Sequence, residues 1–205
     1  MWRVVESGGW LMVPIVLCSA LALAIVLERL WALSQRRVMP PGLVERVATW
    51  FETGQPRARE LEALRSNSAL GFILAAGLEH VGEGREAVRE RLEDAGRQTV
   101  QELERYLNTL GTIAVISPLL GLLGTVLGMI RVFAVLTSQG SADPASLAGG
   151  ISEALITTAA GLVVAIPALI AYRYLRGRIE SLALSMEGEA SALVRRLSAV
   201  QAMPQ

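Results

Sequence analysis

Three long apolar stretches interrupt an otherwise charged chain of 205 residues. They run over 10–27, 107–130 and 154–172. A helix of roughly 20 apolar residues crosses the hydrocarbon core of a bilayer, and each stretch reaches or nearly reaches that length. The pattern therefore predicts three membrane-spanning helices.

Outside these stretches, apolar residues recur at helical spacing on a charged background, which indicates helices with one packed face. We expect spans two and three to continue as long helices into a helical domain outside the membrane, giving an all-α membrane protein. Shorter amphipathic pieces at 43–51 and 70–81 fill the rest of that domain, separated by proline and glycine. The predicted stripes are Val88, Leu92, Ala95, Thr99, Leu103 and Tyr106/Leu107 before span two, and Ile179, Leu182, Met186, Leu193 and Leu197 after span three.

Composition narrows the class of protein further. Hydrophobic residues make up 52% of the chain, and 19 basic residues balance 19 acidic ones. The basic residues are all arginine and form no dense block, so we expect no nucleic-acid binding. Cys18 is the one cysteine, which rules out an internal disulfide, and no Cys/His spacing predicts a metal site. Sequence motifs of metalloproteases, serine hydrolases and nucleotide-binding enzymes are absent, so we expect no enzyme.

Arginine flanks predict the orientation of the spans, because cytoplasmic flanks are enriched in basic residues. The short connection 138–145 carries none, so this connection and the N-terminus are expected outside the cytoplasm. More arginine follows the first span than precedes it, which favours an uncleaved anchor over a signal peptide. Arg131, near the outer end of span two, is the exception. The cytoplasmic flanks are Arg29, Arg36 and Arg37 after span one, Arg97 and Arg105 before span two, and Arg173, Arg176 and Arg178 after span three.

Glu153 is the candidate with the clearest chemistry. It opens the third apolar stretch, where a carboxylate is costly and by default suggests an ion pathway or proton relay. It can meet Arg131 at similar depth, or it can lie at headgroup level and only complete the first turns of its helix. Arg131 can equally extend to the outer interface.

Three threonines accompany this carboxylate. Thr157 and Thr158 follow it closely, and Thr125 lies on span two. Counted from Asn108 and Arg173, Thr125 lies about 25 Å up its helix and Thr158 about 22 Å up its own, so the two are nearly level. Their hydroxyls can line an axis between several subunits, or they can bond to the preceding turn of their own helix.

Small residues on spans two and three predict close helix packing, within one subunit or between subunits. Proline inside a membrane helix is tolerated and introduces a kink. The packing candidates are Gly121, Gly124, Gly128 and Gly161, and the prolines are Pro118 and Pro167.

Two blocks of the sequence resemble a known family. The run SPLLGLLGTVLGM in span two and the run ISEALITTAAGLVVAIPA in span three fit, in order and spacing, the MotA/TolQ/ExbB proton-channel family. The resemblance covers roughly 107–178. Within the family the blocks are most similar to ExbB, with TolQ next and MotA more distant.

The resemblance implies a homopentamer in the bacterial inner membrane, with protons as the coupling ion and no bound cofactor. Its partners would be a single-span protein of the ExbD type in a central pore and a TonB-type protein. It implies that Thr125 and Thr158 line the pore beside Glu153. The resemblance assigns no role to Arg131; from their positions near Glu153 and Thr158, Arg131 and Thr157 are further candidates, as modulators of the site. The expected organisation is a periplasmic N-terminus at 1–9, spans at 10–33, 107–137 and 146–173, a cytoplasmic helical domain at 34–106, a periplasmic loop at 138–145 and a cytoplasmic tail at 174–205.

The function expected from this resemblance is a motor subunit that uses the proton-motive force to energise import through the outer membrane. Two alternatives stay open at this stage. One is a TolQ-like subunit that serves envelope integrity, and the other is a membrane scaffold that conducts no ions.

Overall fold

The computed structural model describes residues 9–53, 58–139 and 144–201, and all regular structure in these ranges is helical. A short 3-10 turn, η1, covers Val81–Glu83. The helices are α2 Met12–Ala32, α3 Gln35–Val38, α4 Leu43–Thr53, α5 Ala58–Asn67, α6 Ala69–Leu78, α7 Arg85–Leu103, α8 Leu107–Gln139 and α9 Pro144–Gln201.

Helices α2, α8 and α9 contain segments long and apolar enough to cross a membrane, which confirms the three predicted spans. Their outward faces carry large apolar side chains, with Leu17 65% exposed and Val163 70% exposed. A soluble protein rarely exposes an apolar surface of this extent, whereas a membrane span presents one to lipid.

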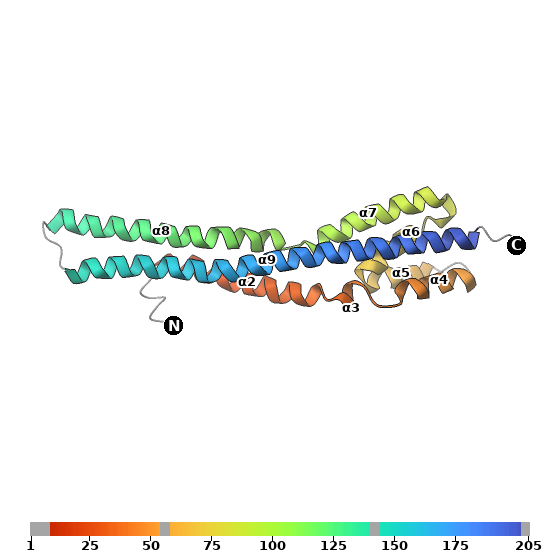
Figure 1. Cartoon of the computed structure of the whole chain (residues 1–205), viewed down its shortest axis with the longest axis horizontal. Helices are drawn as coiled ribbons and strands as arrows, with labels where there is room; N and C mark the ends of the chain where they lie inside the picture. The colour runs from red at the N-terminus through yellow and green to blue at the C-terminus, as the bar shows by residue number, and fades with distance from the viewer. Residues whose placement is uncertain (1–8, 54–57, 140–143, 202–205) are drawn as a thin grey trace. The chain divides into compact units, whose positions relative to one another are not determined.

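The described chain divides into two compact units. The first contains α2 up to Glu28 and the segment Tyr106–Tyr174, which holds α8 and the membrane part of α9. α8 and this part of α9 lie side by side in opposite directions (Figure 1). This antiparallel pair carries every candidate residue of the site.

The second unit contains Arg29–Arg105 and the chain from Leu175 onward. α6 packs against α5 and α7, and the predicted stripes of α7 and α9 supply buried residues of its core. Ser68 caps α6 by accepting a hydrogen bond from the Gly71 amide at 3.0 Å. The buried Arg29 donates to the Leu103 carbonyl at 3.2 Å and so ties the end of α2 to the end of α7.

The two predicted helix extensions have different outcomes. α9 runs without interruption from Pro144 to Gln201 and passes through Pro167, as expected for span three. Span two does not continue into α7: residues 104–106 form a turn, and Tyr106 has a left-handed φ of 65°. A bulky residue in that region is uncommon, and a local turn of this kind is not visible in a periodic pattern.

Helix starts and short connections were predicted in part. Pro144 is the first helical residue of α9, as its fixed φ favours. The sequence also favours Asp143 as the N-cap of this helix and residues 54–56, which contain glycine and proline, as a turn; both lie outside the described residues. The amphipathic pieces predicted at 43–51 and 70–81 correspond to α4 and α6.

Candidate functional site

The interface between α8 and α9 is built from glycine. A Cβ added at Gly121 would lie 2.9 Å from the Thr158 Cα, and one at Gly161 would lie 2.5 Å from the Ser117 carbonyl oxygen. Gly124 and Gly128 face Thr157 and Ala154 in the same way. The backbones therefore approach as closely as small residues allow, and the predicted packing glycines act within one subunit.

The three candidate threonines all donate hydrogen bonds to backbone carbonyls. Thr157 donates to Glu153 at 2.8 Å and Thr125 to Leu122 at 2.7 Å, both within their own helix. Such back-bonding is a common arrangement for threonine in membrane helices.

Thr158 differs from the other two because its hydroxyl crosses the interface. It donates to the Gly121 carbonyl of α8 at 2.8 Å and so joins the two helices. Gly124 faces Thr157, which places Thr125 about 3 Å further along the pair than Thr158. Within one subunit, Thr125 and Thr158 therefore lie at nearly the same level along the helix pair, as expected.

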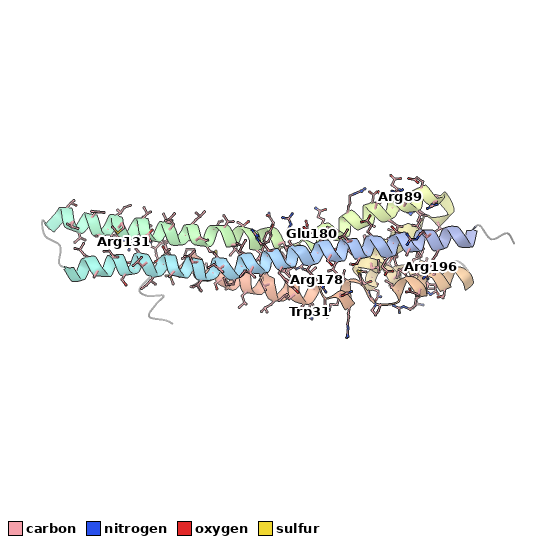
Figure 2. All side chains as sticks on the ribbon, viewed as in Figure 1. Trp31, Arg89, Arg131, Arg178, Glu180 and Arg196 are labelled. Carbon is pink, nitrogen blue, oxygen red and sulfur yellow. The ribbon has the colours of Figure 1, made fainter. Side chains whose placement is uncertain are left out.

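Glu153 and Arg131 form an ion pair across the same interface. The Arg131 guanidinium donates from Nη1 to Glu153 Oε1 at 2.9 Å, and Figure 2 labels Arg131 on α8. The Glu153 side chain is 30% exposed and that of Arg131 56%. Within the described ranges 107–139 and 144–172, Arg131 is the only basic side chain and Glu153 is the only acidic one.

Gly9 lies against the same carboxylate, from the segment that precedes α2. A Cβ at Gly9 would overlap Glu153 Oε1, and the residue has a left-handed φ of 68°. Only glycine combines this backbone conformation with so close an approach. The carboxylate is therefore held between the guanidinium of α8 and the backbone before α2.

Sequence reasoning missed two residues of this region. Ser117 is fully buried beside Gly161, and within the described chain its hydroxyl has no hydrogen-bond partner. Ser117 shares one face of the helix with Gly121 and Gly124, at spacings of four and three residues. This spacing could have predicted that Ser117 lies in the helix interface. Gly9 had none, because its role depends on a contact with a residue distant in sequence.

In the second unit an open groove of about 1060 Å³ lies between α7 and α9. Its floor is apolar, with Leu92 and Met186, and its rim carries charges of both signs, such as Arg89 and Glu187. In the described ranges no three His, Cys, Asp or Glu side chains gather to hold a metal ion.

The chemistry that the first unit offers is proton exchange on one carboxylate. A charged carboxylate can accept the hydrogen bonds of a guanidinium, whereas a protonated one is neutral and loses the electrostatic attraction. Arginine stays charged throughout, so only the Glu153 partner changes state.

These features define a multi-pass α-helical membrane protein with an ion pair between two close-packed helices. The chain matches the MotA/TolQ/ExbB proton channel family over residues 65–188, more than half its length, and it belongs to that family.

Relatives from both the ExbB and TolQ branches match the chain. ExbB-like 1 of Synechocystis sp. is 39% identical over 82% of this chain and 68% of the relative. Biopolymer transport protein exbB1 of Vibrio cholerae is 34% identical over 80% and 74%. Tol-Pal system protein TolQ of Haemophilus influenzae is 41% identical over 43% and 39%. Similarity to the first two of these relatives thus extends over more of the chain than similarity to this TolQ protein.

Proposed function

We propose that the chain is an ExbB-type motor subunit that uses the proton-motive force to energise import through the outer membrane. The observation that carries the proposal is Glu153, the single acidic side chain in the described ranges 107–139 and 144–172, which lie in the part of the chain that matches the proton channel family. Protons are the coupling ion, and no bound cofactor is needed.

The depth of Glu153 supports a role at the outer end of the proton path. It lies 20 residues from Arg173 along α9, or about 30 Å, which equals the thickness of the hydrocarbon core. With Arg173 at the cytoplasmic interface, Glu153 lies where protons from the outer water first reach the helix pair. Each proton that crosses yields about 2.3 kcal/mol per 100 mV, so several protons drive one mechanical step.

The assembly that we propose is a homopentamer around a pore that holds a single-span partner of the ExbD type, which acts on a TonB-type protein. The ExbB-named relatives of Synechocystis sp. and Vibrio cholerae support this assignment, because they match more than three quarters of the chain. Thr125 and Thr158 line the pore in this proposal, with Thr157 and Arg131 as modulators. The N-terminus is periplasmic and the C-terminus cytoplasmic.

The test compares energised uptake of an iron chelate by cells that lack the native gene and carry either the wild-type chain or Glu153→Gln. Glutamine keeps the size of the side chain and removes its titration. We expect Glu153→Gln to lose uptake while still co-purifying with the ExbD-type partner. Normal uptake by this variant would exclude Glu153 as the proton carrier and would favour a scaffold that conducts no ions.

A TolQ-like role is the second candidate, and the match to TolQ favours it. The mechanism would be the same and the output would be envelope integrity. Rescue of detergent sensitivity in cells without TolQ, together with no rescue of chelate uptake, would assign the chain to that branch.

A further inference from the structure

The ion pair between Arg131 and Glu153 has a consequence for the proposed function, on which this inference rests. Arg131 is the only cation in 107–139, and Glu153 is the only anion in 144–172, within the described chain. They contact one another at 2.9 Å. A lone charge in an apolar helix is far more costly than a pair, so each of the two stabilises the presence of the other.

The surroundings of the carboxylate limit where it can go. Arg131 contacts it from α8, and Gly9, which has no titratable group, contacts it from the segment before α2. The Glu153 side chain is 30% exposed, so the described chain does not enclose the carboxylate. The site is held on two sides and open on a third.

We propose that Arg131 is the positioning residue of the proton-carrying carboxylate: it holds charged Glu153 against Gly9 and releases it when a proton binds. Protonation removes the charge on which the ion pair depends, and the neutral side chain is then free to turn away from the guanidinium. Arg131 stays charged in both states and draws the side chain back once the proton has left. The pair converts proton binding into a change of side-chain position.

The first test measures protonation of Glu153 directly, with the full chain in its native membrane complex. Dicyclohexylcarbodiimide reacts with protonated carboxyl groups in apolar surroundings, and mass spectrometry of the Glu153 peptide reports the rate. We expect Arg131→Gln to raise this rate about tenfold, because one charge-assisted hydrogen bond is lost. Arg131→Lys keeps the charge and should stay within about twofold of the wild type.

Arg89→Gln is the matched control for the loss of an arginine. Arg89 also pairs with a glutamate at 2.9 Å, but it does so with Glu93 on the surface of the second unit. The labelling rate of Glu153 should be unchanged in this variant. Equal labelling in Arg131→Gln and the wild type would overturn the proposal.

Chelate uptake separates positioning from a structural ion pair. We expect Arg131→Gln to reduce uptake about tenfold and Arg131→Lys to restore most of it. The exchanged pair Arg131→Glu with Glu153→Arg should assemble yet stay inactive, because the attraction returns but the carboxylate now lies on α8. Full uptake by the exchanged pair would show a purely structural salt bridge and overturn the proposal.

Gly9 provides an independent variant. Gly9→Ala places a methyl group where Glu153 Oε1 lies, and it also strains a left-handed backbone. Gly42→Ala introduces the same strain, at a φ of 70°, with nothing within 4 Å of the new methyl group. We expect faster labelling of Glu153 in Gly9→Ala and no change in Gly42→Ala; equal rates in the two variants would remove Gly9 from the site.

The two proposals fail in distinguishable ways. If Glu153→Gln retains uptake, the proton-motor function fails whatever Arg131 does. If Glu153→Gln is inactive while Arg131→Gln matches the wild type in labelling and uptake, only the positioning role of Arg131 fails.

Discussion

Thr158 and Thr125 are residues of one type that make different hydrogen bonds. The Thr158 hydroxyl bonds to a carbonyl of the opposite helix, whereas the Thr125 hydroxyl bonds within its own turn. A pore-lining role and a packing role for Thr158 do not exclude one another, because a hydroxyl that donates one bond still has lone pairs to accept others. Loss of stability can therefore be measured separately from loss of transport.

We predict that Thr158→Val lowers the free energy of unfolding by about 0.6–1 kcal/mol, since valine has the same shape but cannot donate to Gly121. Thr125→Val should change it by less, because its bond does not join two helices. Reversible unfolding in detergent micelles measures both values. An equal effect of the two substitutions would show that the Thr158 bond adds no stability across the interface.

At this scale the sequence was most informative about rare charges. Glu153 and Arg131 stand out because ionisable groups seldom occur in apolar helices, and a count of residues from the helix ends placed them at similar depth. Whether the two side chains meet depends on the rotation of each helix about its axis. In the structure they do meet, with Arg131 Nη1 2.9 Å from Glu153 Oε1. The contact of Gly9 with Glu153 was not predictable, because it joins residues that lie far apart in the chain.

The two faces of helix α8 differ in composition according to what each face contacts. The glycines of α8 lie on the face toward α9, and apolar side chains such as Val115 and Leu122 lie on the exposed face. Lipid is as apolar as a side chain and gives no hydrophobic drive for helix pairing, so close backbone packing and interhelical hydrogen bonds supply the attraction.

We predict opposite effects for two glycine substitutions in α9. Gly161→Ala brings a methyl group to 2.5 Å from the Ser117 carbonyl, a backbone atom that cannot rotate away. It should destabilise the protein by about 1–3 kcal/mol. Gly177→Ala has nothing within 4 Å of the new methyl group and should stabilise the helix by up to about 1 kcal/mol. Thermal unfolding of the two variants checks the signs, and a stabilising Gly161→Ala would contradict the close interface.

Helix existence was predicted well and helix continuity less well. Long apolar periods identified the membrane parts of α2, α8 and α9, and the stripe of α7 named residues that are indeed buried, Val88, Leu92, Ala95 and Thr99. The turn before α8 escaped prediction because Tyr106 is not a residue that favours a left-handed φ. The strained backbone at Tyr106 depends on the packing around it, and the residue type alone carries no information about that packing.

For the whole molecule, the resemblance in two sequence blocks and the comparisons lead to the same family. The two compact units also follow the division between apolar and charged segments of the chain. The orientation in the membrane and the assembly remain predictions, since they depend on a bilayer and on other subunits.

We predict opposite accessibility for two cysteines placed in a chain whose own Cys18 is changed to serine. Ser141→Cys, in the expected periplasmic loop, should react with a membrane-impermeant maleimide in intact spheroplasts. Gly82→Cys, at an exposed position of η1 with open space around it, should react only after lysis. The reverse pattern would invert the orientation, and reaction of both cysteines after lysis is the control.

The glycine contacts between α8 and α9 also constrain how this sequence can evolve. Gly121 and Gly161 face backbone atoms of the opposite helix. Any other residue at these positions would add side-chain atoms where the interface has no room for them. Exposed positions such as Leu17 and Val163 can exchange one apolar residue for another, because lipid has no fixed shape to match. Neutral drift should therefore accumulate on the outer faces of the helices, while the inner faces change only through paired substitutions on both helices.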